Sequence, residues 1–293
     1  MKIIQSYWSK PYNRASNGFY GGWYSKTFHY MSCALSCLKL SEFYTVELIT
    51  DKRGKRLLVE EMGLPYKSVY DDLEYIDYPE DLWAVGKIVA YAKQNESFIH
   101  VDNDIFIWNS FSNDLVNSDL IAQSEEENHE YYEKFYDDIS KFFDYIPQQI
   151  LEHRENYSQQ KNFSVNAGIL GGNNVDFIKE YTNEAFIFIE KNLKNLNKLP
   201  DPSSFNLLFE QYLFYCIAQT NKEEIGYYFD TKMDSRYKEL LSFWNVPNSC
   251  SYIHPLSNYK NYYIICEQIT QRLWFEYPDY YKRIQELIKQ NIL

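Results

Sequence analysis

Short apolar runs alternate with helix-like patterns in the first third of the chain. The runs over 3–8 and 46–49 are typical of buried strands, and a weaker run over 68–70 predicts a third strand. Between these runs, apolar residues recur every three or four positions and predict helices over about 25–40 and 54–63. Alternation of this kind is typical of an α/β sheet.

The alternation continues before a change of character near residue 124. A clear helical pattern opens at Asp81, and apolar runs over 98–101 and 120–122 predict two more strands. The stretch over 124–162 is acidic and aromatic and has no strand periodicity. Because it is shorter than most domains, we expect a helical excursion from the sheet. Its tyrosines Tyr131, Tyr132 and Tyr136 could contact an acceptor molecule, or the excursion could be purely structural.

The remaining elements are predicted to be mainly helical. A strand and turn over 165–172 precede a predicted helix over 176–193. The segment 205–218 is apolar almost all round, which is typical of a buried helix. The stretch 267–293 predicts one or two amphipathic helices broken at Pro278.

Composition and charge narrow the class of function. With 293 residues, of which 45% are hydrophobic, the chain can bury a sizeable core. Its formal net charge is −12 and it has no stripe of lysines and arginines, so we expect no nucleic-acid partner. A phosphate-bearing substrate remains compatible with this charge if a divalent cation accompanies it.

Cysteine usage and hydropathy indicate an intracellular protein. The five cysteines include no Cys-x-x-Cys pair, which favours reduced thiols. The N-terminus opens on an apolar strand rather than a signal peptide, and no apolar window approaches the ~18 residues of a membrane span. We therefore expect a cytoplasmic protein with no membrane span.

The strongest chemical signal is an apolar strand that runs straight into Asp102 and Asp104. Burying two carboxylates without a cation would be costly, and carboxylate oxygens suit Mn²⁺ or Mg²⁺, which would bridge to a diphosphate. The C-terminal end of a strand is also where α/β proteins bind ligands. A polar turn after a strand explains the same residues, so both interpretations stay open.

Three later segments carry polar groups that could serve a ligand. Asn166 precedes a glycine-containing turn and offers a donor and acceptors to a hydroxyl-rich ligand. Glu210 and Gln211 interrupt an apolar helix and therefore need partners or line a polar cleft. His254 could bind a metal, and Lys260 could neutralise phosphate. Each segment also has a structural explanation: an ordinary turn, a buried polar pair, or an unremarkable histidine.

In this order, the four segments resemble the GT-A class of glycosyltransferases, and most closely its retaining, galactosyltransferase-type branch (family eight and its relatives). That branch has a strand ending in Asp-x-Asp, an Asn-[Ala/Ser]-Gly-[Val/Ile]-Leu segment, an acid-Gln pair and a His-x-x-Gly-x-x-Lys segment. The matching residues are Asp102 and Asp104, Asn166 to Leu170, Glu210 with Gln211, and His254 with Lys260. Ser257 stands where the pattern has Gly, and Glu210 where Asp is usual.

The resemblance implies a GT-A fold, which is a Rossmann-like mixed central sheet flanked by helices. It spans residues 1–265, so we expect the catalytic domain there, with the helical excursion over about 124–162. Residues 266–293 would form a C-terminal helical extension.

The resemblance also implies a metal-dependent, retaining hexosyltransferase. It would move a sugar from a nucleotide-diphosphate sugar, expected to be a UDP-sugar, to an unknown acceptor (glycan, peptide or small molecule). Asp102, Asp104 and His254 would hold Mn²⁺ or Mg²⁺, and Gln211 and Glu210 would be catalytic. The residues implied to contact the donor are Tyr7, Trp8, Thr50, Asp51, Lys87, Asn103, Asn166, Ala167, Gly168 and Lys260. Among these, Lys87 is also compatible with a solvated helix charge.

Two other classes of function compete with this interpretation. Haloacid-dehalogenase-type phosphatases also have a strand ending in Asp-x-Asp, with the first Asp as nucleophile. Phe106 stands where that pattern requires Thr or Val. A non-catalytic nucleotide-sugar-binding protein is the other alternative, and the intact Asp102, Asp104 and His254 argue against it. The sequence leaves the sugar, the acceptor and the oligomeric state open.

Overall fold

The computed structural model describes residues 1–13, 20–127, 129–157, 163–230 and 237–293. The chain divides into two compact units, which are treated separately below. The terminal unit comprises Lys2–Ile76, Val101–Ser110 and Arg236–Leu293. The central unit comprises Asp77–His100 and Phe111–Ser235.

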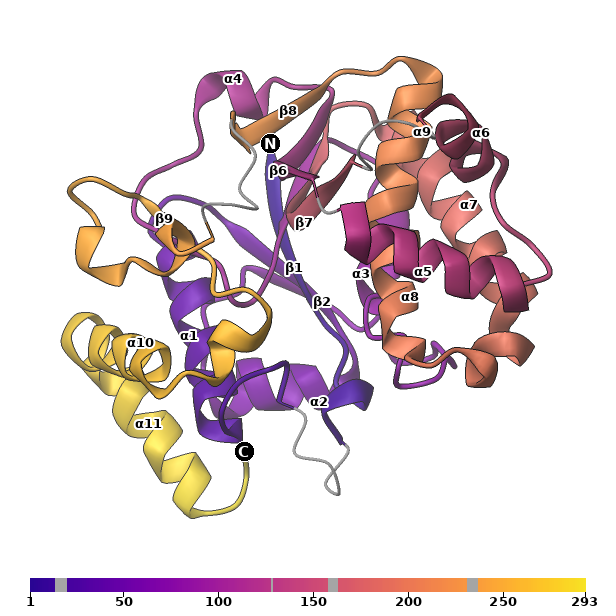
Figure 1. The fold of residues 1–293 in the computed structure, drawn as a ribbon. Coiled ribbons are helices and arrows are strands. Elements are labelled where there is room, and N and C mark those ends of the chain that lie inside the picture. Colours follow the sequence, from indigo (N-terminus) through magenta and orange to yellow (C-terminus); the bar gives the residue numbers. More distant parts are fainter. Residues whose placement is uncertain (14–19, 128, 158–162, 231–236) are drawn as a thin grey trace. The chain divides into compact units, whose positions relative to one another are not determined.

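Three strands that pair in parallel lie in the terminal unit, and two of them, β1 and β2, are labelled in Figure 1. They are β1 (Lys2–Tyr7), β2 (Val46–Thr50) and β3 (Ser68–Tyr70), in the order β3-β2-β1. Ile3 lies opposite Val46 in the register of the first pair. Because β1 and β2 are buried along most of their length, they appear in the sequence as largely apolar runs. All three predicted strands are confirmed.

Helices of the terminal unit follow its strands. α1 (Lys26–Ser41) follows β1, as predicted. The helix predicted after β2 begins earlier, with α2 (Lys52–Gly54), and continues as a π-helix over Lys55–Glu61. Asp51 caps it, since its Oδ1 accepts a hydrogen bond from the Gly54 N–H at 2.7 Å.

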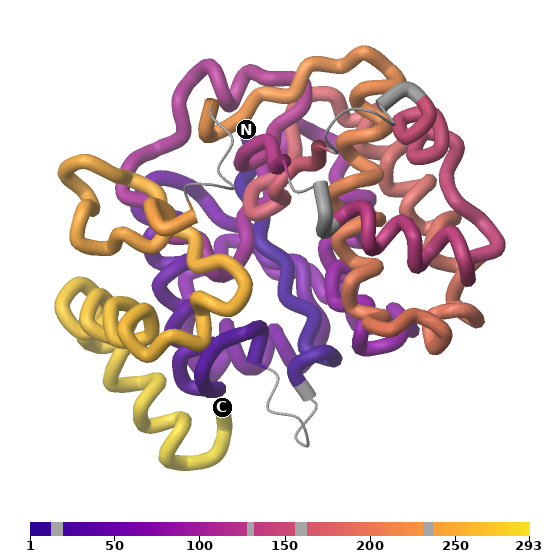
Figure 2. The backbone as a smooth tube through the Cα atoms, viewed as in Figure 1, coloured from indigo at the N-terminus to yellow at the C-terminus, as the bar shows by residue number. Residues whose placement is uncertain are grey.

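The C-terminal helices α10 (Tyr263–Glu276) and α11 (Pro278–Lys289) pack on each other and on α1. They form the yellow end of the chain in Figure 2. The predicted break at Pro278 is confirmed, and proline occupies the first helical position, where its missing N–H needs no partner. The unit also contains the antiparallel pair β5 (Phe106–Ile107) and β9 (Tyr252–Ile253).

Four further strands pair in the order β4-β7-β6-β8 and lie mainly in the central unit. They are β4 (Phe98–Val101, whose last residue already belongs to the terminal unit), β6 (Leu120–Glu127), β7 (Phe163–Gly172) and β8 (Ile225–Phe229). β6 is antiparallel to β7 and parallel to β8, so this sheet is mixed.

The helical excursion contains α5 (His129–Phe142) and α6 (Gln148–Tyr157), while residues 128 and 158–162 lie outside the described part. The excursion starts later than residue 124, because β6 continues to Glu127 and pairs with the start of β7. Glutamates occupy those last strand positions, so the sequence carried no apolar alternation there.

The other helices of the central unit include the one predicted over 205–218, which a π-helical turn interrupts. They are α3 (Val85–Ala92), α4 (Asn113–Val116), α7 (Val175–Asn192), α8 (Phe205–Leu207), the π-turn Leu208–Tyr212 and α9 (Leu213–Asn221). Short 3₁₀ segments in the two units are Lys10–Asn13, Leu193–Lys198, Pro202–Ser204, Glu239–Leu241, Phe243–Asn245 and Ser257–Asn261.

The strands and helices together confirm the mixed α/β class predicted from the sequence. Among the described residues, no helix has both the length and the hydrophobicity needed to span a bilayer.

Candidate functional site

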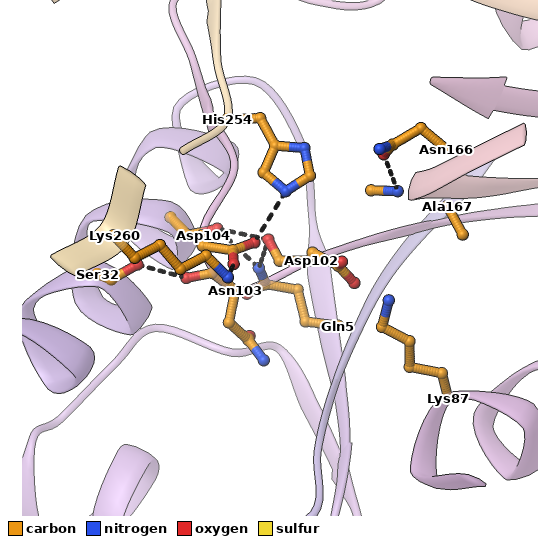
Figure 3. A network of polar contacts seen from close by, with 12 residues as sticks. Gln5, Ser32, Lys87, Asp102, Asn103, Asp104, Asn166, Ala167, His254 and Lys260 are labelled. Atoms are coloured by element: carbon orange, nitrogen blue, oxygen red, sulfur yellow. Dashed lines mark hydrogen bonds and ion pairs between the residues drawn. The ribbon is translucent and has the colours of Figure 1, made fainter. Parts of the chain in front are cut away.

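Two short segments far apart in the sequence bring three metal-ligand side chains together in the terminal unit. Asp102 and Asp104 lie between β4 and β5, and β5 pairs with β9. His254 directly follows β9, and its Nε2 lies 3.4 Å from Oδ1 of Asp104. One ligand atom from each of the three side chains lies within 4.8 Å of the others (Figure 3).

The backbone of the Asp-x-Asp turn is held by hydroxyl groups of α1. Oγ of Ser32 donates to the Asn103 carbonyl oxygen at 3.0 Å, and Oγ of Ser36 donates to the Asp102 carbonyl oxygen at 3.2 Å. The Asn103 amide in turn donates to the Ser6 carbonyl oxygen at 2.7 Å. These bonds fix the turn before any ligand arrives, which is how a binding site is pre-organised.

Sequence analysis missed these supporting residues, although each left a signal. Ser32 and Ser36 stand one helical turn apart among the buried residues of α1. Gln5 lies fully buried within β1, where it donates to Oγ of Ser36 at 2.9 Å and accepts from the Tyr66 hydroxyl at 2.9 Å. A buried polar residue has to find a buried partner, which marks all three as residues with a structural role without naming their partners.

Lys260 places its ammonium group on Asp104, in contact with Oδ2 (Figure 3). Burial by itself raises the pKa of Asp104, but the charge of Lys260 and the contact with His254 outweigh burial and lower it. Asp104 is therefore a carboxylate, and Lys260 already supplies one positive charge beside it.

The donor set fits a divalent cation. Two carboxylates and one imidazole provide oxygen and nitrogen ligands of the kind that Mn²⁺ accepts, and the oxygens suit Mg²⁺ as well. Oδ1 of Asp104 is buried and has no hydrogen-bond partner among the described residues, since the 3.4 Å to His254 exceeds ordinary hydrogen-bond length. A lone pair thus remains for a cation.

The residues expected to cradle the base and ribose lie at the carboxyl ends of β1 and β2. Oγ1 of Thr50 donates to the Tyr7 carbonyl oxygen at 2.6 Å, and Oδ2 of Asp51 accepts from the Ser9 N–H at 2.7 Å. These contacts join the two strand ends. Trp8 is buried beside them.

An aromatic stack that sequence analysis missed adjoins these strand ends. The Tyr12 ring stacks on Tyr7, with centroids 5.3 Å apart, and lies 4.6 Å from the His29 ring. Burial, aided by Lys260, lowers the pKa of His29 to about 3, so its imidazole is neutral. No pattern in the sequence singled out Tyr12.

A second polar cluster lies in the central unit, between α3 and the π-turn. Nζ of Lys87 lies 2.7 Å from Oε1 of Glu210, which also accepts from the Tyr91 hydroxyl at 3.4 Å. The Lys87 side chain is only 14% exposed, so it is paired rather than solvated. Burial raises the pKa of Glu210, and Lys87 opposes that shift.

Gln211 faces a different element from its neighbour Glu210. Its Oε1 accepts a hydrogen bond from the Ala167 N–H on β7 at 3.2 Å. On the same strand, Oδ1 of Asn166 accepts from the Gly168 N–H at 2.9 Å. The central unit therefore brings the Asn166–Gly168 segment and Gln211 together.

Glu126 completes this cluster and was also missed. Its Oε1 accepts from the Asn166 amide at 2.8 Å, and its Oε2 accepts from the Tyr132 hydroxyl at 3.3 Å. The signal was a run of three glutamates directly after an apolar strand.

Tyr132 also stacks on Tyr212, and Tyr136 lies under Arg154, so these two tyrosines of the excursion serve packing. The side chain of Tyr131, considered with them, lies outside the described part.

Comparison with known proteins gives one family and several distant structures. The model of a family described as "Family of unknown function (DUF6734)" matches residues 1–287. No curated protein matches the sequence.

Among solved structures, the chain is similar to three glycosyltransferases. The glycosyltransferase GlyE of Streptococcus pneumoniae TIGR4 is 13% identical with a TM-score of 0.41, and the match covers 99% of this chain and 64% of that one. The chain thus spans about two thirds of GlyE. Mouse xyloside xylosyltransferase 1 is 9% identical with a TM-score of 0.40, covering 86% and 96%. The galactosyltransferase LgtC, solved with donor and acceptor sugar analogues, is 11% identical with a TM-score of 0.40, covering 94% and 99%. At these values, function has to be argued from the residues of this chain.

Proposed function

The chain belongs to a family of unknown function (DUF6734), and we propose that it is a metal-dependent glycosyltransferase. It would transfer a hexose from a nucleotide-diphosphate sugar, in our proposal a UDP-sugar, to an acceptor with retention of configuration. The observation that carries the proposal is the convergence of Asp102, Asp104 and His254, with their ligand atoms within 4.8 Å of one another and Lys260 beside them.

Glycosyl transfer from such a donor requires that the departing diphosphate be stabilised. Mn²⁺ or Mg²⁺, held by Asp102, Asp104 and His254, would supply Lewis-acid stabilisation of that leaving group. Lys260 would bind the diphosphate through its ammonium group. Because α1 already holds the Asp-x-Asp turn through Ser32, the carboxylates need little reorganisation on binding.

In the central unit, we propose that Gln211 and Glu210 act on the transferred sugar. A glycosyl transition state resembles an oxocarbenium ion, so it gains from a negative dipole end nearby, which the Gln211 amide oxygen can provide. Lys87 fixes the carboxylate of Glu210 through the 2.7 Å contact. Asn166 would present the polar groups that remain on its amide to sugar hydroxyls.

The other proposed donor contacts follow from their places at strand ends. Tyr7, Trp8, Thr50 and Asp51, at the carboxyl ends of β1 and β2, would adjoin the base and ribose. Lys87, Asn103, Ala167, Gly168 and Lys260 complete the proposed donor-binding set. We propose that the catalytic domain spans 1–265, with a helical extension over 266–293.

A screen of nucleotide sugars tests the proposal. The purified protein is incubated with UDP-sugars and other nucleotide sugars plus Mn²⁺, and release of the nucleoside diphosphate is measured with and without EDTA. We expect release with at least one donor, abolished by EDTA and by Asp104→Asn. The matched control is Asp71→Asn, which changes an exposed aspartate of the same unit and should retain release. A folded protein that neither binds nor hydrolyses any of these donors would refute the proposal.

A further inference from the structure

An exposed aromatic surface lies in the terminal unit, near the start of α1 and of α10. Its members are large aromatic or aliphatic side chains from two segments far apart in the sequence. They are Tyr24, Phe28, Tyr259, Tyr262, Tyr263 and Ile264, and we call them the tyrosine surface.

The rings of this surface contact one another in two groups, Tyr24 with Phe28 and Tyr263, and Tyr259 with Tyr262, which meet in the chain at Tyr262 and Tyr263. Phe28 and Tyr259 are half-buried, and the other members are exposed. The Tyr263 ring lies 6.0 Å from Tyr24 and 6.1 Å from Phe28, both edge to face. Tyr259 and Tyr262 lie 5.6 Å apart. Tyr24 and Tyr263 nevertheless remain 58% and 57% exposed. Large aromatic side chains that stay exposed beside one another favour an interaction site.

The surface is continuous with the candidate metal centre through Lys260. The Tyr24 N–H donates to the Lys260 carbonyl oxygen at 3.3 Å, and Tyr259 directly precedes Lys260 in the chain. The ring of Trp23, next to Tyr24, lies 5.9 Å from Nζ of Lys260. The ammonium group of Lys260 contacts Asp104, which is a proposed metal ligand. Lys260 therefore connects the tyrosine surface to the candidate metal centre.

We propose that the tyrosine surface binds the acceptor and that this acceptor is a glycan, an inference that rests on the proposed function. A tyrosine ring offers an apolar face to the C–H face of a sugar, and its hydroxyl can bond to sugar hydroxyls. Four of the six side chains are tyrosines, so the surface carries both features. Its continuity with Lys260 would bring a bound glycan up to the leaving diphosphate.

The composition of the surface favours a glycan over a lipid bilayer. Helices that lie on membranes present aliphatic residues, tryptophan and phenylalanine together with lysines and arginines. Here phenol groups predominate, and the chain has a net charge of −12, which anionic lipid repels.

The test uses a printed glycan array, followed by titration of the best-binding glycan into the full-length protein with UDP and Mn²⁺. We expect at least one glycan to bind the wild type. The double variant Tyr24→Ala/Tyr263→Ala should bind it roughly tenfold more weakly, because two stacking rings are lost. The control double variant Tyr75→Ala/Trp274→Ala removes two exposed aromatics of the same unit outside the surface and should bind like wild type.

Three results would overturn the inference: no binding to the array, equal loss in both double variants, or unchanged binding in Tyr24→Ala/Tyr263→Ala. Size-exclusion chromatography with light scattering and flotation with phosphatidylserine vesicles are run on the same proteins. Self-association of the protein through this surface, or binding of this surface to the vesicles, would also overturn the inference. Binding of UDP with Mn²⁺ to the wild type is recorded separately. If that binding fails, the proposed function fails; if it holds while the glycan result is negative, only the acceptor inference is lost.

Discussion

At the scale of single residues, Lys260 and a divalent cation would share Asp104. The ammonium group contacts Oδ2 of that carboxylate, and a Cβ added at Gly22 would lie 3.4 Å from Cδ of the Lys260 side chain. Two cations on one carboxylate repel each other, whereas a diphosphate would draw the ammonium group to itself. Lys260 should therefore weaken binding of the metal alone and strengthen binding of the metal with a nucleotide.

Replacing Lys260 separates these two effects. We expect Lys260→Met to bind Mn²⁺ alone several-fold more tightly, and to bind Mn²⁺ with UDP more weakly, as measured by calorimetric titration. The control is Lys289→Met, at the exposed end of α11, which should change neither affinity. Tighter binding in both titrations would remove Lys260 from the diphosphate site.

Ser257 is the position where the galactosyltransferase-type pattern that the sequence resembles has glycine, and its backbone has the conformation that glycine favours. Its φ is +47°, in the left-handed region, which costs a residue with a Cβ about 1–2 kcal/mol. Glycine would remove this cost, but its greater freedom in the unfolded chain offsets part of the benefit. We therefore expect Ser257→Gly to stabilise the protein by about 0.5 kcal/mol or more. Urea unfolding measures the change. The control is Ser249→Gly, which changes an exposed serine that does not have a positive φ and should destabilise the protein. A change in stability of the same sign in both variants would contradict the argument.

At the scale of elements, the π-turn Leu208–Tyr212 decides where the acid-Gln pair points. An extra residue in one turn changes the angular spacing of the side chains. Glu210 contacts Lys87 on α3, while Gln211 contacts the backbone of Ala167 on β7. The sequence could predict a buried helix here and could predict that the pair needs partners. It could not predict the π-turn. Hydrophobic residues lie on every side of this helix, so the sequence pattern does not show where the helical periodicity shifts.

The contact between α3 and the π-turn should matter for stability as well as for the proposed chemistry. Glu210 is 1% exposed, so removing its charged partner leaves a buried carboxylate with only the Tyr91 hydroxyl beside it. We expect Lys87→Met to destabilise the protein by about 3–5 kcal/mol, and Lys87→Met/Glu210→Leu to recover most of that loss. Urea unfolding tests this, with exposed Lys134→Met as the control. Equal stability of wild type and Lys87→Met would show that Glu210 is satisfied without the lysine.

At the scale of the whole molecule, the sequence predicted the elements better than the supports of the site. Apolar runs placed β1, β2 and β4, and Pro278 placed the break between the last two helices. Hydrophobic periodicity did not predict the end of β6, because that part of the strand consists of glutamates and is held by pairing with β7. Ser32, Gln5 and Glu126 escaped notice because their roles depend on partners distant in sequence, and spacing along one chain does not reveal such partners.

The net charge of the whole chain makes a further demand on the proposed donor. A chain of charge −12 repels a nucleoside diphosphate, so UDP should bind appreciably only together with a cation at Asp102, Asp104 and His254. Binding of the two ligands is then mutually reinforcing, and that coupling is reciprocal.

A ligand at a hundred times its Kd stabilises the folded state by about 2.7 kcal/mol. We therefore expect UDP with Mn²⁺ to raise the melting temperature by several degrees, and more than the sum of the separate rises. Asp102→Asn should lose this excess, while Asp71→Asn should keep it. If UDP raised the melting temperature equally in EDTA, the nucleotide would bind without the cation and the carboxylates would need another explanation.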